Sequence, residues 1–165
     1  MNAPDDRGMT RAEEVLEAAQ PLARHGQLCD SGRLVEWMDL FAEECVYRIV
    51  PRENFDRGLP VTLLQCDNRR QLRDRVVSLL EAMKYNIHTD RHVIGMPVVV
   101  ERTGGVIKVE ASFVILQADA EGVGAMFAFG RYFDDLVYEG GRLRFKSKVA
   151  VIDNFEIPHA LSTPI

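Results

Sequence analysis

The chain has 165 residues, a length that suits one domain with a core large enough to fold without disulfides or metals as staples. Apolar residues make up 47% of the sequence and charged residues 27%, as in ordinary globular proteins. The formal charge of −5 speaks against a nucleic-acid surface, and no apolar run reaches the length of a membrane span.

The cysteines and the first ten residues indicate in which cellular compartment the protein is expected. Cys29, Cys45 and Cys66 are odd in number and lack a C-x-x-C spacing, so we expect reduced thiols in a cytoplasmic protein. The opening residues, MNAPDDRGMT, are polar and acidic and do not resemble a signal peptide. Residues 1–9 are expected to form a disordered leader and residues 10–165 a single domain.

Two helices are predicted near the start of the chain. Thr10 and Glu13 have the T-x-x-E form of a capping box, which indicates a helix start just after Thr10. Pro21 is expected to kink or interrupt this helix, because proline lacks the backbone N–H that a helix interior needs. Asp30 or Ser31 is expected to cap the second helix, since short polar side chains accept hydrogen bonds from the first free N–H groups.

A third helix is predicted in the middle of the chain. It begins after the cap signature of Asn68 and Gln71 and is expected to end near Lys84. Its apolar residues keep a period of 3.6, at Leu72, Val76, Leu79, Leu80 and Met83.

The second helix has its own apolar face, formed by Leu34, Trp37, Met38 and Phe41. We therefore expect Trp37 to be buried against a sheet.

Strands dominate the second half. Short strands are expected at 46–50 and 61–66, on either side of an exposed, turn-rich segment at 52–60. From Val93 onward the apolar period changes to 2, which is typical of strands. Long strands are predicted at 93–102, 106–118, 125–138 and 142–153, with glycine-containing turns between them. Helices followed by an antiparallel meander predict an α+β fold with a curved sheet over the helices.

Alternation is clearest in the last predicted strand. One set of its residues is apolar: Leu143, Phe145, Val149 and Val151. The intervening set is cationic: Arg142, Arg144, Lys146 and Lys148. Since successive side chains point to opposite faces, the cations are expected on a solvated face. A further apolar set is expected on a second sheet face that one domain cannot cover, which favours a trimer: Phe113, Ile115, Phe127, Phe129 and Tyr132.

The segment after the third helix holds His88, Asp90, Arg91 and His92. Two histidines and a carboxylate are ligand types for zinc or non-haem iron. We expect no metal here, because the i, i+4 spacing is taken to align the histidines only within a helix and Arg91 adds a fixed positive charge. The favoured interpretation is a polar junction at a subunit interface.

A competing interpretation places Tyr47, Asp39, His88 and Asp90 around a cone-shaped cavity, where a carboxylate or histidine would act as a general base. No carboxylate stands isolated within an apolar strand, the usual arrangement for raising its pKa. The sequence also lacks a G-x-S-x-G elbow, and its glycine pairs fall at hairpin positions. We therefore predict no catalytic, cofactor-binding or metal-binding residues in this chain.

Several segments, taken in order, resemble the small (β) subunit of the Rieske-type aromatic-ring-hydroxylating dioxygenases. The similarity extends from about residue 14 to about residue 160. The segments that carry it are RLVEWMDLF at 33–41, CVYRI at 45–49, REN at 52–54, GLP at 58–60, LRDRV at 72–76 and RH at 91–92. None of them is a catalytic signature, but their joint order and spacing are specific.

The resemblance implies a cystatin-like α+β cone, of the same superfamily as nuclear transport factor 2 and the ketosteroid isomerases. It implies a non-catalytic structural subunit with a larger α subunit as partner. That α subunit would carry the Rieske 2Fe–2S cluster and mononuclear Fe(II), with electrons from NAD(P)H through a reductase. The family's usual assembly is α3β3 with a trimer of β subunits. The candidate interface residues are Arg52, His88, Asp90, Arg91 and His92.

The resemblance also bears on the substrate. Residues 52–68 and 85–95 look more like the small subunits of enzymes that take terephthalate, salicylate or related aromatic acids than like those that take benzoate. The alternative function is a stand-alone cone-fold enzyme of the isomerase or dehydratase kind, or a small-molecule binder. In either case no nucleic acid or membrane is expected as a partner.

Overall fold

A computed structural model of the chain describes residues 8–81, 87–154, 156–157 and 161–165. The elements are α1 (Arg11–Asp30), α2 (Leu34–Met38), β1 (Phe41–Pro51), α3 (Arg52–Asp56), β2 (Leu64–Cys66), α4 (Arg69–Glu81), β3 (His88–Ile94), β4 (Val98–Thr103), β5 (Val106–Asp119), β6 (Gly124–Glu139) and β7 (Arg142–Ile152). No helix within these described ranges is long and apolar enough to cross a membrane.

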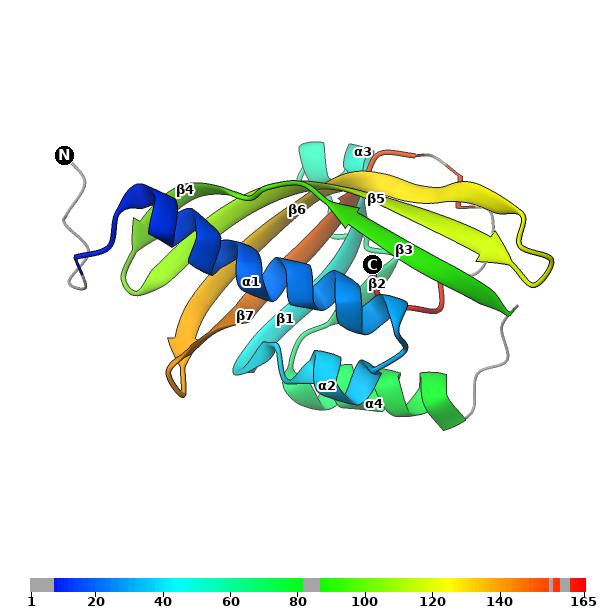
Figure 1. Cartoon of the computed structure of the whole chain (residues 1–165), viewed down its shortest axis with the longest axis horizontal. Coiled ribbons are helices and arrows are strands. Elements are labelled where there is room, and N and C mark those ends of the chain that lie inside the picture. The colour runs from blue at the N-terminus through cyan, green and yellow to red at the C-terminus, as the bar shows by residue number, and fades with distance from the viewer. Residues whose placement is uncertain (1–7, 82–86, 155, 158–160) are drawn as a thin grey trace.

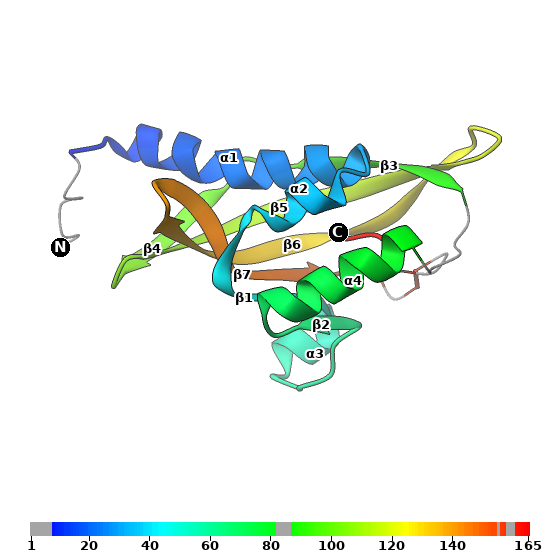
Figure 2. The same ribbon diagram turned by 90° about the horizontal axis from the view of Figure 1, so that it is seen from below.

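A curved seven-stranded sheet holds α1, α2 and α4 against its inner side (Figures 1 and 2). The strand order is β2-β1-β7-β6-β5-β3, and β4 pairs with β5 beside β3. All pairings are antiparallel except that of β1 with β7. The predicted α+β fold with a mainly antiparallel sheet is therefore confirmed. The parallel pair arises because β1, the first strand in the chain, lies beside the last.

The start of α1 is as predicted, and its middle is not. The Thr10 side chain accepts a hydrogen bond from the Glu13 N–H, and the Thr10 N–H donates to Glu13 Oε2 at 2.7 Å, so the capping box is confirmed. The interruption expected at Pro21 is absent, since α1 continues through this buried proline as far as Asp30. Packing of the long helix along the sheet outweighs the backbone hydrogen bond that proline removes.

The second helix is not capped as expected. Asp30 is the last residue of α1, and Ser31 closes that helix by donating from its Oγ to the Gln27 carbonyl at 2.7 Å. α2 begins after Arg33 without a side-chain cap. The Asp30 carboxylate instead accepts a hydrogen bond at 3.1 Å from the His92 N–H of β3. A partner distant in sequence therefore replaces the local one.

The predicted strand boundaries in the first half are too narrow or too wide. β1 begins at Phe41, well before residue 46, and β2 is limited to Leu64–Cys66. The predicted exposed segment at 52–60 contains the short helix α3.

Trp37 is buried as predicted, with 1% of its surface exposed. The Asn68 cap is confirmed by a 2.9 Å bond from the Gln71 N–H, whereas the helix end expected near Lys84 lies outside the described residues.

The predicted strand at 93–102 is two strands. β3 and β4 both pair with β5, and they are separated at residues 95–97. Pro97 offers no N–H to a ladder, and the Gly95 N–H bonds to the Ser112 carbonyl at 2.8 Å. β3 also starts earlier than predicted, at His88, which places the whole His88–His92 segment in a strand rather than in a junction before one.

A bulge changes which residues of β7 face the core. Phe145 pairs with Leu136 and Ser147 with Asp135, so Lys146 is an extra residue on β7. Beyond the bulge the alternation is reversed, and Lys148 lies in the core, fully buried. The expectation that all four cations of this strand lie on a solvated face is therefore wrong for Lys148.

The predicted second apolar face is mostly the core itself. Four of its five members are buried in the hydrophobic cluster: Phe113, Ile115, Phe127 and Tyr132. Only Phe129 faces the opposite way, where it pairs with Val114 of β5. The prediction was wrong because periodicity groups residues by face without saying which face meets the helices.

Candidate functional site

The interior between α1 and the sheet contains a buried histidine with two partners. His25 of α1 is fully buried, and its Nδ1 accepts a hydrogen bond from Trp37 Nε1 at 2.8 Å. Its Nε2 lies 3.4 Å from the Tyr132 hydroxyl of β6. Burial, followed by the nearby charge of Lys148, holds the pKa of His25 well below its usual value. His25 is therefore neutral, with its proton on Nε2, because Nδ1 is the acceptor of the Trp37 bond.

A buried ion pair lies beside this histidine. Lys148 Nζ is 3.0 Å from Asp134 Oδ2, and both side chains have no exposed surface. Lys148 Nζ also lies 3.5 Å from the centre of the Tyr132 ring and 4.6 Å from that of Phe145, which adds cation–π attraction. Burial raises the pKa of Asp134 to about 6 and lowers the pKa of Lys148. For each partner desolvation outweighs the attraction of the other.

β3 directs His88, Asp90 and His92 to the interior, because residues i, i+2 and i+4 of a strand share a face. The expectation that this spacing aligns the histidines only in a helix is therefore wrong. His88 Nε2 lies 3.4 Å from Asp90 Oδ2, and Asp90 Oδ1 accepts from Gln117 Nε2 at 2.9 Å. His92 Nδ1 lies 2.6 Å from Asp30 Oδ1, which ties β3 to the end of α1.

The predicted interface residues separate into two groups. The side chains of His88, Asp90 and His92 are 4%, 7% and 0% exposed and bind within the chain. Arg91 points outward with 68% of its side chain exposed, and Arg52 is 42% exposed and forms a 2.7 Å ion pair with Asp153. Contact with another subunit stays a prediction, and only the two arginines are accessible to a partner.

Of the four residues of the competing cavity interpretation, His88 and Asp90 lie together, but Asp39 and Tyr47 do not share one site. Asp39 lies at the surface, 71% exposed, and its Oδ1 is 3.1 Å from Arg69 Nη2. The Tyr47 hydroxyl is inside, where it accepts from the Ile165 N–H at 2.9 Å and donates to the Ile165 carbonyl at 3.1 Å. Asp90 Oδ2 accepts from the Thr163 hydroxyl at 3.0 Å. Ile165 and Thr163 thus take up hydrogen-bonding positions of Tyr47 and Asp90.

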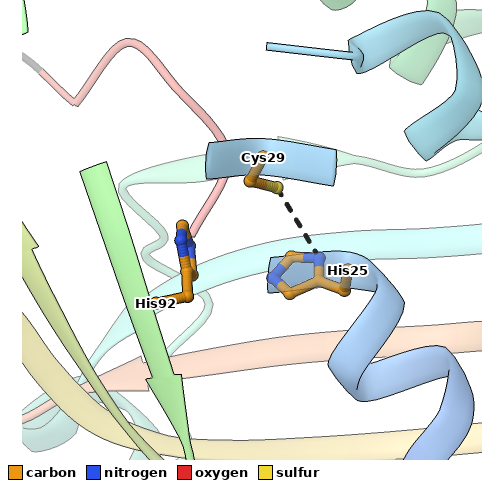
Figure 3. A group of neighbouring side chains, drawn as sticks. All are labelled: His25, Cys29 and His92. Carbon is orange, nitrogen blue, oxygen red and sulfur yellow. Dashed lines mark hydrogen bonds between the residues drawn. The ribbon is translucent and has the colours of Figure 1, made fainter. Parts of the chain in front are cut away.

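A third group of side chains combines α1 with β3. His25, Cys29 and His92 each offer a ligand atom, and these atoms all lie within 4.8 Å of one another (Figure 3). Burial raises the pKa of the Cys29 thiol well above its usual value, so without a bound cation this cysteine is protonated and a poor nucleophile.

Sequence reasoning missed this group, together with Tyr132, Lys148 and Asp134. The available signal was His25-x-x-x-Cys29 on the buried face of a helix. Its third member, His92, comes from a strand more than sixty residues later in the chain.

Comparisons with known proteins agree on one family. Residues 10–149 match the SnoaL-like domain. The small subunit of anthranilate 1,2-dioxygenase from Burkholderia cepacia is 40% identical over 136 residues, which cover 82% of this chain and 84% of that subunit. Subunit β2 of the terminal oxygenase component of terephthalate 1,2-dioxygenase from a Comamonas species is 29% identical over 145 residues, which cover 87% of this chain and 93% of that subunit.

A solved structure extends the similarity to three dimensions. It is described as the β subunit of an aromatic-ring-hydroxylating dioxygenase from Novosphingobium aromaticivorans. The two chains are 34% identical with a TM-score of 0.83, and the match covers 94% of this chain and 100% of that one. The cone expected from the sequence resemblance is confirmed.

Proposed function

We propose, from the premise that this chain belongs to the SnoaL-like domain family, that it is the small (β) subunit of an aromatic-ring-hydroxylating dioxygenase and has a structural role. The observation that carries the proposal is 40% identity over 82% of the chain with a protein that is itself such a subunit. Ring hydroxylation then belongs to a large α subunit. The Rieske 2Fe–2S cluster and the mononuclear Fe(II) are assigned to that partner, with NAD(P)H as the electron source through a reductase.

The state of the interior supports a structural rather than a catalytic role. A general base must reach a proton of the substrate. Here each candidate group is hydrogen-bonded to a partner within the chain: His25 to Trp37, Lys148 to Asp134, and Tyr47 to Ile165. A stand-alone isomerase or dehydratase would need at least one of them directed at an open site. The comparisons favour the subunit over this alternative.

The face of the sheet away from α1, which we term the open face, supports self-association. Val93 pairs with Val114, Val114 with Phe129, and Leu116 with Met126, so these side chains form one continuous apolar area across β3, β5 and β6. Val93 is 54%, Leu116 45% and Met126 51% exposed. Contiguous exposed apolar surface of this kind marks interaction sites. We assign it to a trimer of β subunits within α3β3.

The substrate is proposed to be an aromatic carboxylic acid, since the two curated relatives are named for anthranilate and terephthalate. The α subunit selects it. We place the assembly in the cytoplasm, where the buried free thiols of Cys29, Cys45 and Cys66 stay reduced.

Co-expression with the α subunit tests the proposal. The large subunit is sought as a neighbouring gene product with C-x-H and C-x-x-H motifs. We expect a hetero-oligomer of the two chains by light scattering, with oxygenase iron that is lost when the α subunit is omitted. Turnover of an aromatic acid should require both chains. Isomerisation or dehydration by this chain alone, or failure to associate with the α subunit, would contradict the proposal.

A further inference from the structure

We propose that His25, Cys29 and His92 form a binding site for a zinc ion inside the cone, separate from the oxygenase iron assigned to the partner. Two imidazole nitrogens and one thiolate are zinc ligands, and sites with three protein ligands and an open fourth position are well known. The inference depends on the arrangement of this chain's own residues. It holds whether or not the subunit assignment does.

Both structural elements present their ligands to one space. His25 and Cys29 lie one helical turn apart on α1, with Nδ1 and Sγ 3.9 Å apart, and His92 approaches from β3 (Figure 3). The two imidazole centres are 5.6 Å apart and nearly perpendicular. Zinc bonds of about 2.0–2.3 Å place tetrahedral ligand atoms roughly 3.3–3.8 Å apart. The three ligand atoms now lie within 4.8 Å of one another, so they would have to move about an ångström closer together to bind one zinc ion.

A glycine makes this approach possible. Gly26 lies between the two helical ligands, and a Cβ atom at this position would lie 3.0 Å from the Cβ of His92 and 3.2 Å from Cδ1 of Ile94. Both distances are tighter than ordinary van der Waals contact. Gly26 thus allows α1 to approach β3 closely enough for His25 and Cys29 to lie beside His92.

His92 supplies an independent indication of a ligand. Its side chain has no exposed surface, and its Nδ1 is 2.6 Å from Asp30 Oδ1, a carboxylate that is itself 8% exposed. Its Nε2 has no hydrogen-bond partner among the described residues. Buried polar atoms without partners are uncommon in folded proteins. A carboxylate on one nitrogen and a free lone pair on the other is the arrangement that orients metal-bound histidines.

Charges of both signs surround the site. The carboxylates of Asp30 and Asp90 lie near the Cys29 thiol, while Lys148 is paired with Asp134 and Arg91 lies 3.6 Å from Asp30 Oδ2. Zinc replaces the thiol proton: the Cys29 S–H bond breaks, a Zn–S bond forms and the proton passes to solvent. The bound Zn²⁺–thiolate unit carries one net positive charge beside the carboxylates.

Zinc must displace the hydrogen bonds that His25 Nδ1 makes with Trp37 Nε1 and with Cys29 Sγ. The Nδ1 lone pair of His25 now accepts from Trp37 Nε1 at 2.8 Å. Coordination takes this lone pair, so the indole N–H loses its acceptor. Trp37 is the single tryptophan of the chain, and its fluorescence therefore reports occupancy. This site revises the expectation of no metal, which considered His92 with His88 and not with α1.

The test uses the full chain, stripped of metal with a chelator and titrated with Zn²⁺ and, separately, with Co²⁺. We expect one ion per chain, a change in Trp37 emission, and the near-ultraviolet charge-transfer band of a cobalt–thiolate bond. Cys29→Ser should abolish that band, and Asp30→Asn should weaken binding about 10- to 100-fold by releasing His92. Cys45→Ser, a buried thiol outside the group, and His88→Gln, the other inward histidine of β3, serve as matched controls.

Circular dichroism checks that each variant folds. X-ray absorption of the zinc-loaded natural chain provides a measurement without any substitution, with one sulfur and two nitrogen ligands expected. Three results would overturn the site: no saturable binding by the folded chain, a thiolate band that persists in Cys29→Ser, or a first coordination shell without sulfur. Equal loss of binding in the control variants would also overturn it.

Discussion

The interior of the cone and the open face of the sheet differ in which of their groups have partners. Inside, charged and polar side chains pair with one another, as in Lys148 with Asp134 at 3.0 Å. On the open face, apolar side chains such as Val93 and Met126 are about half exposed. A buried histidine or carboxylate is thus no sign of activity when its bonds are already made. Function is better sought where bonding or burial is incomplete, as on the open face and at buried atoms such as His92 Nε2 and Asp134 Oδ1.

Breaking the interior ion pair should have the largest effect. Asp134→Ala leaves Lys148 buried without a counter-charge and should lower the free energy of unfolding by about 3–5 kcal/mol in urea titrations. The matched double variant, Asp134→Leu with Lys148→Met, should recover most of this loss because no charge stays unpaired. If the stable double variant assembles with the α subunit yet loses turnover, the pair is catalytic, and the interior is not purely structural.

Arg91 tests the part of β3 that faces outward. Arg91→Ala should weaken assembly by about 2–5 kcal/mol if the guanidinium pairs across a boundary, since loss of one partner leaves the other desolvated and unpaired. The isolated chain should stay folded, because 68% of the Arg91 side chain is exposed. Analytical ultracentrifugation of the complex measures the change, with the exposed Arg57→Ala as control. Intact assembly with collapsed turnover would assign β3 to catalysis.

The pH dependence sharpens the description of the interior. The pKa of Asp134 is raised to about 6 from the ordinary 3.8, so the folded state holds this proton more tightly than the unfolded state does. Stability from this group is present at low pH and is lost as pH rises from about 4 to about 6, by about 2–3 kcal/mol. The stability difference between the natural chain and Asp134→Asn should shrink over that window. A difference that grows with pH would show that Lys148 lowers this pKa instead.

The smallest effect is expected for one apolar side chain of the open face. Leu116→Ser should weaken trimer formation by about 1–2 kcal/mol per copy, the cost of losing one aliphatic contact, without destabilising the monomer. Leu63→Ser is the matched control, because Leu63 is 50% exposed and Leu116 45%. Concentration-dependent light scattering distinguishes them. Equal effects of the two substitutions would remove the open face as the trimer contact.

The sequence pattern alone predicted those elements whose structure depends on residues close together in the chain. The Thr10–Glu13 box and the Asn68 cap each satisfy helix N–H groups within three residues, and both are confirmed. The alternation from residue 106 onward predicted β5, β6 and β7 to within a few residues. The order of short segments along the chain also identified the family, since it depends on sequence alone.

Tertiary structure decided what depends on cross-strand register and on packing between distant elements. The bulge at Lys146 buries Lys148, because pairing with β6 reverses the alternation that the sequence shows. Asp30 binds His92 rather than capping α2, because β3 presents an N–H and an imidazole to it. His25, Cys29 and His92 meet only because α1 packs closely on β3 at Gly26. Periodicity predicts which residues share a face of a strand, but only tertiary packing decides whether that face contacts the helices or the solvent.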